Sequence, residues 1–143
     1  METTSWLVFA LLSAVFAALT NFFGKLGVSE NITSNMATWV RVVVSLLVTS
    51  LYVTYRSEWK NPLELPSKAI LFLVLSGIAT GCSWLCYFKA QQIGPASGVA
   101  AVDKLSVALL IVLCVVFLKE DFSLKQWGGA GLILCGVYLV AVK

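Results

Sequence analysis

Residues 93–118 read IGPASGVAAVDKLSVALLIVLCVVFL, and this stretch decides the fold class. From Ala96 to Leu118 only Asp103 and Lys104 carry a charge. A helix needs about 20 mostly apolar residues to cross the roughly 30 Å hydrocarbon core of a bilayer, so this segment is long enough to span one. Pro95 disfavours a helical residue directly before it, which places a tight turn at the start of the segment. The stretch therefore predicts a transmembrane helix that carries charge within its span.

The remainder of the chain repeats this pattern. Of its 143 residues, 59% are hydrophobic and only 12% are charged, whereas a soluble domain is about half apolar and a quarter charged. No apolar run alternates with period two, and open sheet edges cannot face lipid. We therefore expect a single all-α domain over residues 1–143, a multi-pass bundle of about five helices in the cell (inner) membrane. Its predicted helices cover residues 6–23, 36–55, 69–88, 96–118 and 127–142.

Several classes of function are disfavoured by what the chain lacks. Its ten basic residues are scattered singly, so they form no stripe that could follow a nucleic-acid backbone. The four cysteines lie in apolar runs and are interpreted as packing residues, and without a histidine the pair Cys82 and Cys86 lacks further zinc ligands. No nucleophile elbow or phosphate-binding glycine loop is present. We expect no enzyme activity, no metal and no cofactor.

An odd number of helices places the two termini on opposite sides of the membrane, so basic residues can be assigned to sides. The side of the N-terminus receives Arg56, Lys60, Lys68, Lys119 and Lys125, and the other receives Lys25, Arg41, Lys89, Lys104 and Lys143. The count is five against five, or five against three if Arg41 and Lys104 are taken as lying inside helices. The positive-inside rule therefore gives at most a weak bias toward a cytoplasmic N-terminus. It leaves open that copies insert in both orientations.

Asp103 and Lys104 are the first candidates for function, because ionisable groups at membrane depth are costly and commonly mark a pathway or a site. In the functional interpretation, Asp103 faces an internal cavity beside Ser106 and binds a cationic group, a proton or a basic side chain. Neighbouring residues are about 100° apart around a helix, so Asp103 and Lys104 should point in different directions. In the alternative interpretation, the two form a neutralised pair that anchors a helix end.

A polar row on the third predicted helix gives the second group of candidates. Polar groups in hydrocarbon need partners or water, so such a row favours a cavity, although hydrogen bonding between helices would explain it equally well for any single residue. Trp84 lies beside the row and could supply an aromatic wall or a cation contact. Asn21 on the first helix is a weaker candidate. The row consists of Ser76, Thr80, Ser83, Tyr87 and Gln91.

Small residues predict close approach of helices, either within the chain or in a dimer. On the third helix Gly77 and Gly81 form a small-xxx-small pair. The last helix carries Gly128, Gly131 and Gly136.

Taken in order, four motifs resemble EamA-type domains of the drug/metabolite transporter superfamily. They are Ile93-Gly94-Pro95-Ala96, Asp103-Lys104-Leu105-Ser106, Phe117-Leu118-Lys119-Glu120, and Gln126-Trp127-Gly128 continuing to Gly136-Val137. The resemblance implies two five-helix repeats of inverted orientation. This chain has one, so an antiparallel homodimer would supply the second. The last helix is also similar to that of small multidrug resistance proteins, but their glutamate in the first helix is missing, and Asp103 would have to replace it.

The resulting expectation is a secondary transporter that exports small metabolites, amino acids or amphipathic cations by alternating access. Its partners would be a second copy of the chain, the lipid bilayer and a small-molecule substrate. One alternative is a non-transporting membrane subunit of a larger complex, and another is half of a lipid flippase.

Overall fold

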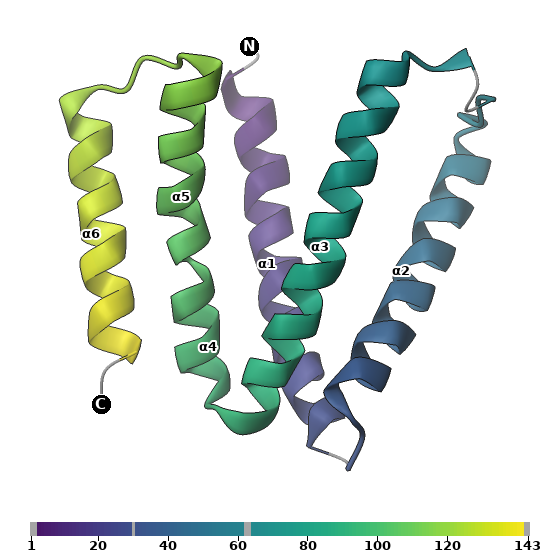
Figure 1. Cartoon of the computed structure of the whole chain (residues 1–143), viewed down its shortest axis with the longest axis horizontal. Coiled ribbons are helices and arrows are strands. Elements are labelled where there is room, and N and C mark those ends of the chain that lie inside the picture. Colours follow the sequence, from purple (N-terminus) through teal and green to yellow (C-terminus); the bar gives the residue numbers. More distant parts are fainter. Residues whose placement is uncertain (1–2, 30, 62–63, 142–143) are drawn as a thin grey trace. The chain divides into compact units, whose positions relative to one another are not determined.

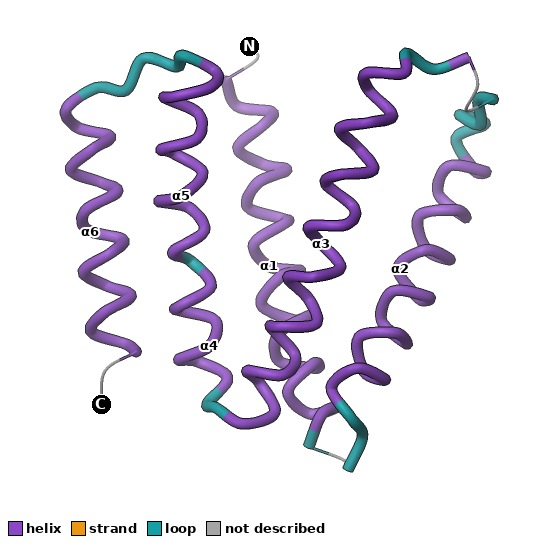
Figure 2. The backbone as a smooth tube through the Cα atoms, in the orientation of Figure 1, coloured by secondary structure: helices purple, strands orange, loops and turns teal. Residues whose placement is uncertain are grey.

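All regular elements in the described residues are helices (Figure 2). The computed structural model describes residues 3–29, 31–61 and 64–141, with side chains from residue 6 onward. In chain order the elements are α1 (Thr3–Val28), α2 (Ser34–Tyr55), α3 (Ser67–Ile93), α4 (Ala96–Asp103), α5 (Leu105–Leu113), the π-helical turn η2 (Cys114–Leu118) and α6 (Leu124–Ala141) (Figure 1).

Five segments of the described chain are long and apolar enough to cross a membrane, with Ala96–Leu118 counted as one. The predicted all-α bundle of five spans is therefore confirmed. Several helices extend beyond the apolar runs from which they were predicted: α1 continues to Val28 and α3 to Ile93. Polar residues such as Lys25 and Gln91 fit the end of a helix, so the helix need not stop where the apolar run stops. Val142, the predicted end of the last helix, lies outside the described residues.

The chain divides into two compact units. The terminal unit consists of Met1–Phe22 and Ile93–Lys143, and the central unit consists of Phe23–Gln92. In the terminal unit, α4 and α5 both pack against α6. In the central unit, the last turn of α1 packs against the end of α3, and α2 contributes a cationic side chain to the same helix.

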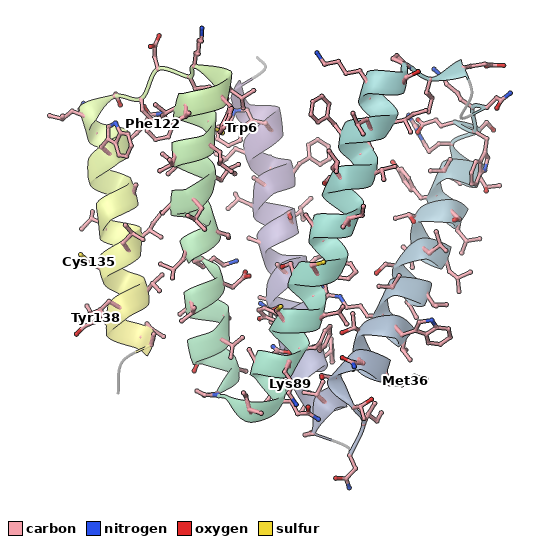
Figure 3. The ribbon with its side chains drawn as sticks, viewed as in Figure 1. Trp6, Met36, Lys89, Phe122, Cys135 and Tyr138 are labelled. Carbon is pink, nitrogen blue, oxygen red and sulfur yellow. The ribbon has the colours of Figure 1, made fainter. Side chains whose placement is uncertain are left out.

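Most of the large apolar side chains point away from the rest of the chain. Phe9, Leu73 and Leu132 are each more than two-thirds exposed, and Tyr138 points outward from α6 (Figure 3). Three of the four cysteines, expected to be packing residues, are also exposed, and only Cys114 is half-buried. In lipid such faces need no protein cover, because hydrocarbon solvates them.

The span predicted over 96–118 is not one continuous α-helix. At Lys104 the amide N–H donates to the carbonyl of Ala101, and the amide of Val107 donates to the carbonyl of Lys104, both at 3.0 Å. These bonds span three residues rather than four, so the turn tightens and α4 ends before α5 begins. Figure 2 shows the break as a short loop-coloured segment. No glycine or proline lies at this point, which explains why the sequence did not predict it.

The start of α6 is fixed by its own side chains. Ser123 precedes the helix, and its amide and hydroxyl both donate to Oε1 of Gln126, at 2.7 and 2.8 Å. Phe122 packs edge-on against Trp127, with ring centroids 5.7 Å apart; Figure 3 labels Phe122 at this end of α6. Together these contacts form a capping box and a hydrophobic staple. These contacts mark the end of the α5–α6 connection and fix the residue at which α6 begins.

Removing the cap should destabilise α6. We expect Ser123→Ala to lower the free energy of unfolding by about 1 kcal/mol, because the first-turn amides lose their side-chain partner. Unfolding in detergent, followed by circular dichroism, measures the effect. Ser83→Ala, an exposed serine within α3, is the control. Equal stability of the two variants would contradict this assignment of the helix start.

Candidate functional site

The end of α1 and the end of α3 approach closely at Gly24. A Cβ atom at this position would lie 3.2 Å from Oε1 of Gln91 and 3.2 Å from Cε1 of Phe88. Phe88 is 3% exposed and Gln91 is fully buried. Gly24 therefore allows two large side chains of α3 to pack directly on the α1 backbone. Gly24 was not among the glycines predicted for helix packing.

Lys25 connects the same two helices through a hydrogen bond. Its Nζ donates to the backbone carbonyl of Gln91 at 2.6 Å. Gln91 lies in the last turn of α3, where carbonyls lack partners within the helix and the helix dipole favours a cation. Nearby, Nε2 of Gln92 donates to the carbonyl of Ile32 at 3.2 Å. Both bonds anchor the end of α3 to the region where α1 ends and α2 begins.

Arg41 of α2 stacks on aromatic rings of α3. Its Cζ lies 4.3 Å from the ring centroid of Trp84 and 5.4 Å from that of Phe88. These two rings are four residues apart and so occupy one face of the helix. Arg41 is half-buried, and within the described residues no carboxylate lies within ion-pair distance of it.

The ring contacts offset much of the cost of this charge. An arginine near the centre of a membrane helix costs about 3 kcal/mol, and a desolvated cation–π contact returns about 1–2 kcal/mol. The rings nevertheless provide no oxygen or nitrogen acceptor for the N–H donors of the guanidinium. Arg41 therefore remains a cation suited to an additional acceptor.

The predicted polar row on α3 divides into two parts. At its C-terminal end Nε2 of Gln91 donates to Oη of Tyr87 at 3.4 Å, and Trp84, beside the row, contacts Arg41. Further toward the N-terminus, Thr80 is exposed and its hydroxyl donates to the carbonyl of Ser76 in its own helix at 2.9 Å. Only the C-terminal part is therefore assembled with α1 and α2 into a cluster, which we call the Arg41 cluster. It consists of Gly24, Lys25, Arg41, Trp84, Tyr87, Phe88 and Gln91.

Asp103 and Lys104 lie in the terminal unit, at the break between α4 and α5. Nζ of Lys104 is 3.6 Å from Oδ2 of Asp103, and their side chains are 54% and 39% exposed. The ion pair agrees with the alternative interpretation of these residues as a neutralised pair. The proposed role of Asp103 in binding a cation stays a prediction. Ser106, placed beside Asp103 in the prediction, is exposed, and Asn21 is half-buried on α1.

The glycines predicted for helix packing make no close approach to another helix in the part of the chain that the structure describes. At Gly77, Gly81, Gly128, Gly131 and Gly136, an added Cβ would meet no described atom within 4 Å apart from the neighbouring turns of its own helix. Gly24, which was not in that group, is the close-approach glycine instead. A role of the five in contacts between chains remains a prediction.

The packing at Gly24 can be tested by adding bulk. We expect Gly24→Val to lower the free energy of unfolding by about 1–3 kcal/mol relative to Gly27→Val, since its methyl groups would collide with Phe88 and Gln91. Gly27 is on the same helix with nothing within 4 Å, so both variants share the same change in helix propensity. Unfolding in sodium dodecyl sulfate measures the difference. Equal stabilities would show that α1 and α3 do not pack closely here.

Comparison with known proteins gives concordant results. Residues 4–142 match the EamA-like transporter family. A protein of Sinorhizobium sp. described as "Uncharacterized transporter in cobO 3'region" is 47% identical over 138 residues, which cover 96% of this chain and 97% of that protein. An uncharacterized protein of Methanocaldococcus jannaschii is 26% identical over 137 residues, covering 96% of each chain. No solved structure matches this chain.

Proposed function

Since this chain belongs to the EamA-like transporter family and is a multi-pass membrane transporter, we propose that it moves small metabolites or amino acids by alternating access as an antiparallel homodimer. The observation that carries the proposal is the Arg41 cluster. In a chain with 12% charged residues, it gathers two cations, a buried amide and a phenol at one place between membrane-spanning helices. Ionisable groups within a span typically line the path of a substrate or an ion.

The homodimer is supported by the single set of five spans and by the exposed faces of the helices. Transporters of this plan place the substrate between two inverted repeats, and this chain contains one set of five spans. The two relatives are about as long as this chain, so the single-repeat form recurs among them. A Cβ added at Gly128, Gly131 or Gly136 of α6 would meet no atom of another described helix within 4 Å, which suits a helix from a second copy. A twofold axis in the membrane plane would create the inverted pair.

Asp103 is proposed to bind the coupling cation, either a proton or Na⁺. It lies at the break between α4 and α5, and interrupted helices in transporters commonly bind ions beside their free backbone groups. Its carboxylate is half-buried and paired with Lys104 at 3.6 Å. A cation arriving at Asp103 would compete with that ion pair, which gives a simple route from ion binding to a change of conformation.

Transport by a single purified chain tests the proposal. Proteoliposomes loaded with a pH-sensitive dye, or placed in a Na⁺ gradient, are exposed to a panel of amino acids and small organic acids. We expect ion-coupled flux with at least one of them, and we expect Asp103→Asn to reduce it at least tenfold, in line with loss of an essential ionisable group. Asp121→Asn, on the exposed α5–α6 connection, is the control. Wild-type flux in Asp103→Asn would remove the proposed role of the carboxylate.

The antiparallel arrangement predicts two orientations in the membrane. Single cysteines at Ser5 and at Lys143, in a background without native cysteines, should each react with an impermeant maleimide from both faces of the cell membrane. The nearly even distribution of basic residues between the two sides is the physical reason. Reaction of each position from one face alone would exclude dual insertion and would require a parallel assembly or a different partner.

The alternative of a non-transporting subunit makes a different prediction. Its motivation is the extensive apolar surface that this chain exposes, which a larger partner could cover as well as a second copy could. A homodimer that transports without any other protein would exclude it. The alternative would be favoured if the chain copurified with another membrane protein and showed no flux when that protein was missing.

A further inference from the structure

Arg41 holds its charge at depth instead of extending it toward the membrane surface. Arg41 lies seven residues after the first residue of α2, about 10 Å along that helix. On α3, Trp84 lies nine residues before the last residue of the helix, about 14 Å from its end, and Phe88 lies five residues before it, about 8 Å from the end. The bond between Gln92 and Ile32 places these two helix ends together. The guanidinium lies nearer to the deeper ring, at 4.3 Å from Trp84 against 5.4 Å from Phe88. It therefore does not snorkel toward the interface.

Arg41 differs in its partners from the other cations that make contacts in the described chain. Lys25 is compensated by the carbonyl of Gln91, Arg56 by Glu58 at 3.3 Å, and Lys104 by Asp103 at 3.6 Å. Among the described residues, Arg41 contacts the rings of Trp84 and Phe88 and interacts electrostatically with Tyr87, but no carboxylate pairs with it. The N–H donors of a guanidinium lie in its own plane and form a fork along its edge. An acceptor that pairs with two of these donors must meet that edge.

The chemistry that fits this edge is a carboxylate. Its two coplanar oxygens accept two parallel N–H bonds from one guanidinium, and its single negative charge matches the single charge of Arg41. A phosphate monoester carries close to two negative charges near neutral pH, and would leave one of them uncompensated, since Lys25 is already bound to Gln91. A cationic group is disfavoured, because both Arg41 and Lys25 would repel it and Arg41 already covers a face of Trp84.

We propose that Arg41, stacked on Trp84, binds the carboxylate of the transported solute, so that the substrate is an organic acid or an amino acid. The inference rests on the proposed transport function and specifies its substrate class. It assigns Trp84 and Phe88 as the surface that orients the guanidinium and Lys25 as the cation that fixes the end of α3. The amphipathic cations considered from the sequence are not the ligands of this cluster.

Binding to the purified dimer in detergent tests this assignment without requiring transport. A variant that retains Trp84 as its only tryptophan, with Trp6, Trp39, Trp59 and Trp127 changed to phenylalanine, reports on the site through its fluorescence. Matched probes of similar size are benzoate, benzamide, benzylamine and phenyl phosphate, with glycine and acetate as smaller carboxylates. We expect saturable changes with the carboxylates and none with the amide or the amine.

Substitutions at Arg41 separate charge from geometry. Arg41→Lys keeps the charge but loses the planar pair of donors, and should weaken carboxylate binding about tenfold to a hundredfold. Arg41→Gln should abolish it. Arg56→Gln, at the other end of the same helix, is the matched control and should bind like the wild type. Size-exclusion profiles and melting temperatures identify any variant that fails to fold, and the comparison of benzoate with benzamide in unsubstituted Arg41 protein does not depend on those variants.

Several outcomes would overturn the inference. One is a response to benzylamine or benzamide that equals the response to benzoate. Others are a response confined to phenyl phosphate, the lack of a saturable response to any carboxylate, and unchanged carboxylate binding in Arg41→Gln.

The proposed function fails in a different way. A protein that binds carboxylates at Arg41 but moves none of them in proteoliposomes retains this site and loses the transport role. If the protein transports solutes while its Arg41 variants bind carboxylates normally, the transport function stands and the Arg41 site is wrong.

Discussion

Placing a hydrophilic side chain in hydrocarbon costs free energy unless a partner is found, and this cost governs how the polar residues of the chain are arranged. Threonines satisfy themselves locally: Thr49 donates to the carbonyl of Ser45 and Thr80 to that of Ser76, each at 2.9 Å within its own helix. Such bonds hold no two helices together. The contacts that cross between helices come instead from Lys25, Arg41 and the end of α3. The central unit is thus stabilised where its few hydrophilic side chains meet.

The same constraint explains why so little of the chain is buried. In water, exposed residues such as Phe9 and Leu132 would drive further collapse, but in lipid they are already in an apolar solvent, and helices associate through close packing and polar contacts. On adjacent residues of α1, Gly24 provides the close packing and Lys25 provides the polar contact. The faces left without protein contact, including the glycines of α6, are those available to lipid or to a second copy.

Five spans could be predicted because length and apolarity alone determine them, and a helix satisfies its backbone whatever its neighbours are. The row from Ser76 to Gln91 was visible as a pattern, yet its division into an exposed part and a packed part depends on where α1 ends, and no local pattern encodes that. The stack of Arg41 on Trp84 joins residues 43 positions apart in the sequence, so only the fold could pair them. At Lys104 the sequence contains no residue that commonly breaks a helix, so the break was missed, whereas the pairing with Asp103 was foreseen as the alternative interpretation of the two charges.

The structure depends on lipid surrounding these helices and on hydrophilic groups lying between them. The most direct test of this arrangement is to measure how accessible spin labels along α3 are to lipid-soluble and water-soluble quenchers. Nitroxides placed one at a time from Leu71 to Gln91 in reconstituted protein would be probed with oxygen, which partitions into lipid, and with a water-soluble nickel complex. Oxygen accessibility should peak at the exposed positions Leu75, Ile78 and Leu85 with a helical period, and should be lowest at Phe88 and Gln91. Accessibility to nickel along the whole helix, or oxygen maxima at Phe88 and Gln91, would contradict the placement of α3 in the membrane and of the Arg41 cluster on its inner face.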